Sequence, residues 1–177
     1  MTAADSALRC SPMSAITIST ASTAADIADV RTLFVEYATS LGFSLCFQGF
    51  DAELAGLPGA YAPPQGRLLL ARVDGVVAGC VALRPLGDGT CEMKRLYVRP
   101  AFHGQGLGRQ LAIAIVREGR QAGYEAMRLD TVPSMTAAIS LYLSLGFVDI
   151  LPYRENPIPG ARYLELTLIE HVSSTSG

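Results

Sequence analysis

The segment from Arg99 to Gln110, RPAFHGQGLGRQ, has the clearest pattern for binding chemistry in the sequence. Gly104, Gly106 and Gly108 lie in it between a strand-like run and a helical run. Because glycine has no Cβ, successive backbone N–H groups can converge on one anion. A helix that begins near Leu107 adds its own free N–H groups and the positive end of its dipole. The segment therefore predicts a site of the size of a pyrophosphate.

Other interpretations of these glycines remain open at this point. A lone Gly-x-Gly-x-Gly also occurs in ordinary turns that bind nothing. A Rossmann fingerprint needs G-x-G-x-x-G and an acidic residue that closes the next strand; Asp130 closes a strand, but the glycine spacing differs. A P-loop needs G-x-x-x-x-G-K-[ST], which the sequence does not contain.

The elements that would position this turn alternate between strand and helix patterns. Thr23 and Ser134 are candidate N-caps, Asp74-Gly75 is typical of a two-residue hairpin, and 84–89 reads as the next turn. A mixed sheet with helices on both faces, an α/β (α+β) class, is the natural packing of this order. Strands are expected over 15–18, 67–73, 76–83, 90–98, 126–131 and 163–169, and helices over 24–40, about 51–57, 107–122 and 135–145.

Two motifs in order resemble the GNAT superfamily of N-acetyltransferases. The glycine turn is similar to the family's acetyl-CoA signature [RQ]-x-x-G-x-[GA], between the flanking runs LYVRPAF and RQLAIA. After MRLDT, the run AAISLYLSLGF resembles the family's second hallmark, a helix that ends in L-Y-x-x-x-G-F. The resemblance spans nearly the whole chain. It implies the GNAT fold, a central mixed, mostly antiparallel twisted sheet with a splayed strand pair and helices on both faces.

The resemblance also implies acetyl-CoA as co-substrate and a set of site residues. Glu92 is the candidate base, at a position where several family members carry a catalytic glutamate, and on a regular strand it would share a face with Lys94 and Leu96. Tyr142 is the candidate acid for the coenzyme A thiolate. The structural alternatives are a surface or salt-bridged carboxylate for Glu92, paired with Lys94 or Arg95, and an aromatic core residue for Tyr142. The cofactor-binding candidates are Leu96, Tyr97, Val98, His103, Gly104, Gln105, Gly106, Leu107, Gly108 and Arg109.

Two positions depart from the family pattern. His103 stands where the signature has Arg or Gln, and Met135 stands where an Asn often begins the last helix. These departures keep a second function class open, a non-catalytic acyl-CoA-binding regulatory module. A third class is an acyltransferase that uses a longer acyl donor. The volume of the pocket near Leu96 and Ala138 would distinguish it from an acetyltransferase.

The acceptor is expected to be a primary amine of a small molecule, amino acid or peptide, attacking in a ternary complex. Phe47 in the loop-rich region 43–66 is a candidate wall of its pocket. Arg84 and Arg154 could hold an acceptor carboxylate bidentately. Two ordinary solvated arginines are the alternative interpretation.

Composition bounds the partners and the compartment. A formal net charge of −2 gives no electrostatic reason to expect nucleic acid, and no apolar run is long enough to span a bilayer. The four cysteines form no C-x-x-C pair, so no metal site is expected, and free thiols suit the cytoplasm. The resemblance is compatible with a homodimer. The expected organisation is a disordered tail over 1–13, a single domain over 14–171 and a frayed end over 172–177.

Overall fold

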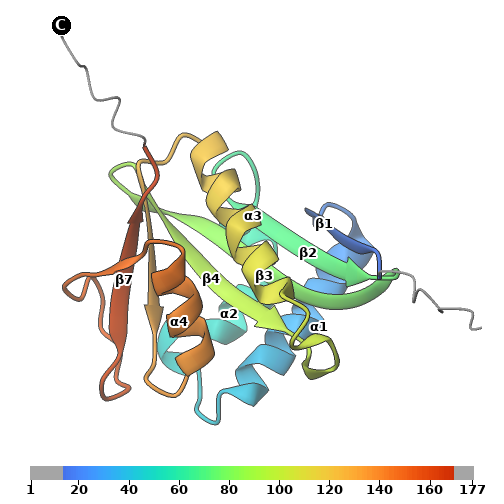
Figure 1. Ribbon diagram of the computed structural model, residues 1–177, viewed down its shortest axis with the longest axis horizontal. Coiled ribbons are helices and arrows are strands. Elements are labelled where there is room, and N and C mark those ends of the chain that lie inside the picture. Colours follow the sequence, from blue (N-terminus) through green and yellow to red (C-terminus); the bar gives the residue numbers. More distant parts are fainter. Residues whose placement is uncertain (1–13, 170–177) are drawn as a thin grey trace, which may run out of the picture.

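The computed structural model describes residues 14–169, so the expected tail over 1–13 and the frayed end over 172–177 lie outside the described residues. Strands and helices alternate along the chain (Figure 1). The strands are β1 (Ile16–Thr20), β2 (Arg67–Val73), β3 (Val76–Gly87), β4 (Thr90–Val98), β5 (Ala126–Thr131), β6 (Val148–Asp149) and β7 (Arg162–Thr167). The α-helices are α1 (Ala24–Ser40), α2 (Phe50–Gly56), α3 (Leu107–Gln121) and α4 (Thr136–Ser144), with 3₁₀ turns η1 (Cys46–Gln48), η2 (Gly59–Tyr61) and η3 (Pro100–Phe102).

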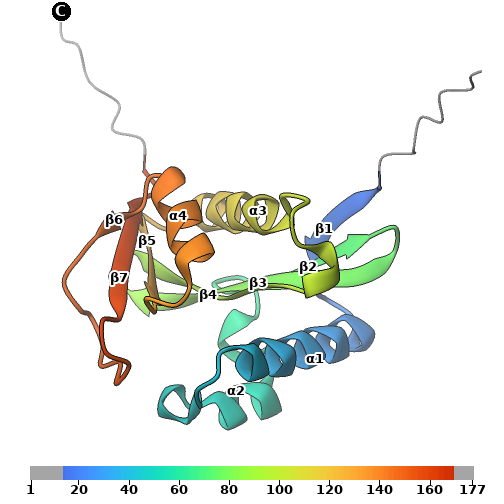
Figure 2. The same ribbon diagram turned by 60° about the horizontal axis from the view of Figure 1, so that its bottom comes forward.

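The described strands form one sheet in the order β1-β2-β3-β4-β5-β7-β6. The pair β4–β5 is parallel and every other neighbouring pair is antiparallel. Figure 2 shows α3 and α4 over one face of the sheet and α1 and α2 over the other. The expected fold class, a mixed and mostly antiparallel sheet with helices on both faces, is confirmed.

Local chemistry explains where several elements begin and end. The Thr23 side chain accepts the N–H of Asp26, and the Asp26 carboxylate accepts the Thr23 N–H, a reciprocal capping box that starts α1. Asp74 and Gly75 have φ of 50° and 81°, as a tight hairpin between β2 and β3 requires. Both predictions are confirmed.

The sheet separates two hydrophobic cores. On the α3 side, Leu111 and Ile115 pack with Met127 and Phe147. On the α1 side, the core contains Phe34, Tyr61 and the inward residues of β2 and β3. Because both faces of β2 and β3 are buried, these two strands read as nearly continuous apolar runs, whereas β4 also carries Glu92, Lys94 and Arg95. Cys80 and Cys91 are buried free thiols in these strands, as predicted.

Three local expectations were wrong. The β3 strand continues to Gly87, so the turn is confined to Asp88 and Gly89, which both have positive φ. Ser134 does not cap α4; Met135 is the N-cap residue and makes no side-chain capping bond. The short strand β6 had no predicted counterpart, since two exposed residues carry no alternation to detect.

The parallel pair β4–β5 separates along its length. Its registered pairs run from Thr90 opposite Ala126 to Glu92 opposite Arg128, and pairing stops there. Beyond Glu92, β4 keeps its partner β3 on one side but has no strand partner on the other. The backbone groups on that open side are available to a ligand, because buried polar backbone must otherwise be paired.

A β-bulge at Arg95 changes which side chains share a face of β4. Arg95 has φ of 58°, and the register with β3 shifts between Cys80 and Ala82. The extra residue breaks the alternation of side chains, so Arg95 follows Lys94 onto the α1 side, where it contacts Glu53. Leu96 instead packs with the core on the α3 side. The expectation that Leu96 shares a face with Glu92 was therefore wrong.

Candidate active site

A cleft opens where β4 leaves β5, and two adjoining cavities fill it. One has a volume of about 500 Å³ and is bounded by Tyr97, Val98 and the first turn of α4. The other has about 410 Å³ and is bounded by the glycine turn and by Ala138 and Leu141 of α4. Leu96, Val98 and His103 line both. The cleft therefore offers a long apolar channel that ends in a ring of backbone N–H groups.

The glycine turn leaves its backbone open to this cleft. Gly104 and Gly106 have φ of 79° and 74°, and no atom lies within 4 Å of the position that a Cβ would occupy on either. The helix α3 begins at Leu107 with no side-chain cap on its N-cap residue, Gly106. The N–H groups of Leu107, Gly108 and Arg109 have no hydrogen-bond acceptor among the described residues. These free donors at the positive end of a helix fit a pyrophosphate.

The side chains flanking the turn are used within the protein. The His103 ring nitrogen Nε2 lies 2.8 Å from the Val98 carbonyl oxygen, so the imidazole closes the turn against the end of β4. Arg109 Nη1 donates to Ser144 Oγ at 2.8 Å and ties α3 to α4. The His103 ring and Arg109 Nη1 therefore already have partners within the protein, whereas the backbone N–H groups at the start of α3 are free among the described residues.

A small cavity of about 40 Å³ lies between the separated strands, next to the cleft. Tyr142, Lys94, Arg95 and Asp130 border it, and Leu96 borders both this central cavity and the cleft. Tyr142 is 6% exposed, and burial raises the pKa of its phenol. The hydroxyl therefore stays protonated at neutral pH, the form that can donate to a leaving thiolate.

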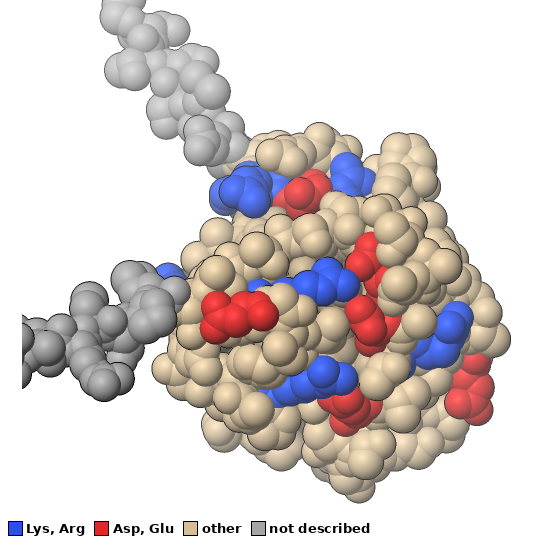
Figure 3. Space-filling view, turned by 90° about the vertical axis from the view of Figure 1, so that its right-hand side faces the viewer, with Lys and Arg blue, Asp and Glu red and all other residues tan. Residues whose placement is uncertain are grey.

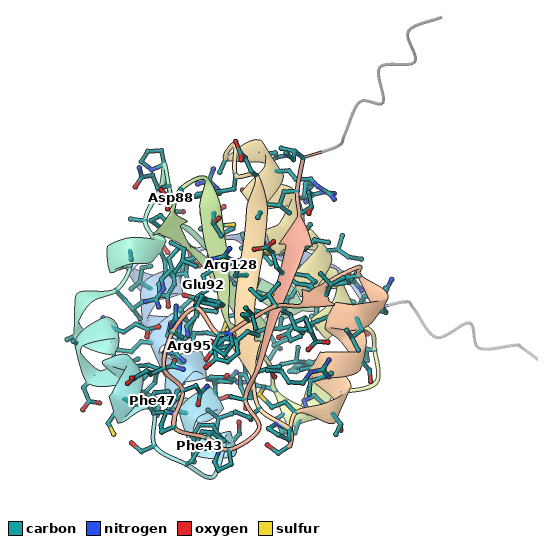
Figure 4. The ribbon with its side chains drawn as sticks, turned by 90° about the vertical axis from the view of Figure 1, so that its left-hand side faces the viewer. Phe43, Phe47, Asp88, Glu92, Arg95 and Arg128 are labelled. Carbon is teal, nitrogen blue, oxygen red and sulfur yellow. The ribbon has the colours of Figure 1, made fainter. Side chains whose placement is uncertain are left out.

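Glu92 lies buried in a cluster of hydrogen-bond donors (Figure 4). Its Oε2 accepts from Arg84 Nε at 2.8 Å, and its Oε1 accepts from the Tyr153 hydroxyl at 2.9 Å. Oε1 also forms an ion pair with Arg154 Nη2. The segment between β6 and β7, which carries Tyr153 and Arg154, passes in front of Glu92 and Arg95 in this view. The carboxylate is completely buried and does not border the central cavity.

Lys94 links this cluster to the central cavity. The side chain is buried, with 4% of its surface exposed. Its Nζ lies 3.1 Å from Gln48 Oε1, 3.5 Å from Asp130 Oδ1 and 3.9 Å from Glu92 Oε1. Burial lowers the pKa of Lys94 to about 8, against the opposing pull of Glu92 and Asp130. It is also the single lysine of the sequence.

Arg95 joins β4 to α2 and to the turn η1. Its guanidinium binds both carboxylate oxygens of Glu53 in α2, at 2.6 and 3.1 Å, and donates to Gln48 Oε1. The ring of Phe50 lies 5.2 Å from its guanidinium carbon. A cavity of about 310 Å³ lies next to this pair, lined by α2, η2 and Arg84. Gln48 borders both this acceptor-side cavity and the central cavity.

The structure brings together most, but not all, of the residues singled out from the sequence. Leu96, Val98, His103, Gly104, Gly106, Leu107 and Gly108 line the cleft, as does Tyr97, whereas Gln105 and Arg109 line neither of its cavities. Arg84 and Arg154 meet at Glu92. Phe47 is half-buried against the α1-side core and borders none of these cavities.

Sequence reasoning missed Lys94 and Asp130 as site residues, as well as Tyr37, which borders the central cavity and the cleft. One signal was in the sequence: the chain has a single lysine against thirteen arginines, and that lysine lies in a predicted strand two residues after Glu92. Asp130 carried no such signal, because its position opposite Lys94 depends on how β4 and β5 are paired.

On the face shown in Figure 3, basic and acidic side chains lie next to one another, and no large area has one sign of charge. Within residues 14–169, no helix is long and apolar enough to cross a membrane. In the same range, no group of three or more His, Cys, Asp or Glu side chains is arranged to hold a metal ion.

Comparison with known proteins agrees with this geometry. The model of the acetyltransferase (GNAT) family matches residues 30–147. An uncharacterised N-acetyltransferase of Schizosaccharomyces pombe is 43% identical over 155 residues, which cover 86% of this chain and 95% of the relative. An uncharacterised N-acetyltransferase of Dictyostelium discoideum is 30% identical over 189 residues, which cover 72% of this chain and 88% of that relative.

The fold is shared with solved structures. The structure of yncA from Salmonella typhimurium with its cofactor acetyl-CoA superimposes with a TM-score of 0.65 at 24% identity, over 92% of this chain and 99% of that one. The open strand β4, the uncapped glycine turn and the family match together identify acetyl-CoA as the co-substrate of an acetyltransferase. This chain belongs to the GNAT family of acetyltransferases.

Proposed function

We propose that the protein transfers the acetyl group of acetyl-CoA to a primary amine of a small molecule, amino acid or peptide, by direct attack in a ternary complex. The observation that carries this proposal is that the cleft, the central cavity and the acceptor-side cavity adjoin one another across the sheet and share lining side chains. Leu96 and Tyr37 border both the cleft and the central cavity, and Gln48 borders both the central cavity and the acceptor-side cavity. Two substrates entering from opposite sides would meet beside Tyr142.

The cleft and the glycine turn are the proposed acetyl-CoA site. The N–H groups of Leu107 and Gly108 would receive the pyrophosphate, and the open edge of β4 at Leu96–Val98 would pair with the pantetheine amides. A backbone N–H of this edge is the proposed donor to the thioester oxygen as it gains negative charge. Gln105 and Arg109 remain proposed contacts to the outer phosphate groups, since both are exposed beside the turn.

Tyr142 is the proposed acid. Glu92 is proposed to supply a negative charge that stabilises the group which takes the proton from the amine. The Tyr142 phenol borders the central cavity, where the thiolate would leave. Glu92 is fully buried and bonded to Arg84, Arg154 and Tyr153, so it would act on the amine through another group. Its buried charge stabilises a cation next to the cavity.

The acceptor-side cavity is the proposed amine site. Arg84 borders it and uses only Nε within the described part of the chain, so both of its Nη groups are free to bind a carboxylate. Arg154 would support the same charge from across Glu92. Phe47 remains a proposed wall, reached only if the 43–48 segment shifts when the acceptor binds.

Calorimetric titration with acetyl-CoA, with NADH as the control nucleotide, tests the cofactor site. Turnover is then measured as free-thiol release with a panel of amines that pairs each amino acid with its amide. Saturable binding of acetyl-CoA and thiol release with an amine support the proposed function. Binding without release for every amine would favour the non-catalytic acyl-CoA-binding module, and binding of NADH alone would contradict the proposal.

A further inference from the structure

Lys94 is a buried titratable group that neither the glycine turn nor the acid Tyr142 explains. Its side chain comes from β4, one residue before the bulge, and reaches the central cavity that Tyr142 and Leu96 also border. In the proposed function the attacking nitrogen reaches the thioester through this cavity. Two basic side chains of the described residues border it, Lys94 and Arg95. Arg95 is paired with Glu53 and an arginine does not give up its proton, so Lys94 is the one that can accept a proton there.

The carboxylates near Lys94 have other cationic or hydrogen-bonding partners, so they do not need a protonated lysine beside them. Glu92 is already bonded to Arg84 and Arg154, two cations on one carboxylate. The only other carboxylate in contact is Asp130, which also accepts the Asn156 amide at 3.0 Å. A protonated Lys94 gives the cluster three cations against two carboxylates, whereas a neutral Lys94 balances it.

The groups that face Lys94 from the other elements leave this balance unchanged. From α2 and η1 come Glu53 and Gln48, but Glu53 is neutralised by its bidentate pair with Arg95. From α1 and α4 come Tyr37 and Tyr142, whose pKa values are raised by burial, so both are uncharged at neutral pH. The one hydrogen bond of Lys94 Nζ is to the neutral amide oxygen of Gln48, at 3.1 Å. A neutral amine can keep that bond, since it still has hydrogens to donate.

We propose that neutral Lys94 is the general base of the acetyl transfer and that Glu92 and Asp130 are positioning residues that hold the lysinium formed. This inference rests on the proposed function. As the N–C bond forms, Lys94 takes one proton from the acceptor nitrogen. The C–S bond breaks, and the thiolate takes the Tyr142 proton. The lysinium then returns its proton to the Tyr142 phenolate within the same cavity, so the amine and the thioester become an amide and a thiol with no net proton change. An acceptor that arrives as an ammonium ion first loses its extra proton to water.

A single lysine makes the titration directly observable. Protein labelled with [ε-¹³C]lysine gives one signal from Lys94, and its shift against pH reports the Nζ ionisation. We expect a midpoint near 8, against about 10.4 for an ordinary lysine. Arg72→Lys is the matched control: Arg72 lies on β2 and pairs with Asp26 and Asp29, so the second lysine signal should titrate in the ordinary range or above it.

The variant Lys94→Arg distinguishes a lysine that acts as a base from one that supplies only a structural positive charge. Arginine keeps the positive charge and the donors but does not deprotonate, so kcat should fall by about 10²- to 10⁴-fold while acetyl-CoA affinity stays unchanged. The limb of the wild-type kcat/KM profile near pH 8 should also disappear, and Arg72→Lys should retain wild-type activity. Wild-type kcat in Lys94→Arg, or a Lys94 signal with an ordinary midpoint, overturns the inference. Failure of the wild-type protein to acetylate any amine would contradict the proposed function instead, and the titration would still be readable.

Discussion

Lys94 and Asp130 face each other across the point where β4 and β5 part. Each lies two residues beyond the last registered pair, Glu92 and Arg128, and their side chains approach to 3.5 Å where the backbones no longer bond. The gap between β4 and β5, the proposed entry of the cofactor to the backbone of β4, is therefore closed on the α1 side by two charged side chains. The separation of β4 from β5 and the contact between Lys94 and Asp130 therefore have the same structural origin.

Gly106→Glu should abolish acetyl-CoA binding. The substitution places a side chain and a negative charge where the pyrophosphate would lie, and it strains a residue with φ of 74°. Gly123→Glu is a matched control, because Gly123 follows the other end of α3 with φ of 85° and equally open space. Calorimetry should show binding for the control alone. Loss of binding in both variants, or in neither, would remove the glycine turn from the cofactor site.

Tyr142→Phe should lower kcat and leave the acetyl-CoA dissociation constant unchanged. The loss of an acid that acts only on the leaving thiolate is expected to cost about 10²- to 10⁴-fold in rate. The phenyl ring keeps the contact with Phe147, so the fold should be retained. Stopped-flow thiol release and calorimetry on the same preparation measure the two quantities. An unchanged rate of thiol release would exclude Tyr142 as the acid.

Glu92→Gln should destabilise the protein and shift the Lys94 titration. The substitution leaves Arg84 and Arg154 without their shared carboxylate, and breaking a buried ion pair from one side typically costs about 3–5 kcal/mol. Because both arginines are partly exposed, we expect the lower end of that range in urea denaturation. The pKa of Lys94 should fall below its wild-type value, because a negative neighbour is lost. An unmoved lysine signal would show that Glu92 does not act on Lys94.

Stability should depend on pH through Lys94. Its folded pKa of about 8 is below its unfolded value, so the folded state binds fewer protons between the two values and stability rises with pH in that window. Between pH 7 and 9.5 the free energy of unfolding of the wild type should gain about 2 kcal/mol relative to Lys94→Met, which lacks the group. Urea denaturation of both proteins at the two pH values measures the gain. A difference that is constant or of opposite sign would contradict the lowered pKa.

The parts of this fold that sequence predicted have local causes. Thr23 and Asp26 can cap a helix with each other, and Asp74-Gly75 can form a tight turn, without help from distant residues. The glycine turn likewise needed only its neighbours. The bulge at Arg95 has no such cause, since arginine does not favour positive φ. It is held there by Glu53, forty-two residues away in the chain.

The same distinction applies to the site. Tyr142 was singled out because it lies inside a recognisable motif, and Glu92 because of its position in the family resemblance, but the residues that contact Glu92 come from elsewhere in the chain. Tyr153 reaches Glu92 across sixty-one residues, and Asp130 meets Lys94 only through the pairing of two strands. Ser134 was a reasonable cap by residue type, yet the chain enters α4 one residue later. Contacts of this range follow from the completed sheet.

The bulge at Arg95 also separates a region of β4 that offers backbone groups from a region that offers side chains. Behind it, the proposed cofactor site consists of main-chain groups of β4 and α3, which almost any sequence can supply. In front of it, the proposed acceptor site consists of side chains carried by the segments 43–66 and 150–161, which contact β4 through Arg95 and Glu92. On this proposal, exchanging those two segments would be a route to new acceptors that keeps the delivery of the acetyl group intact.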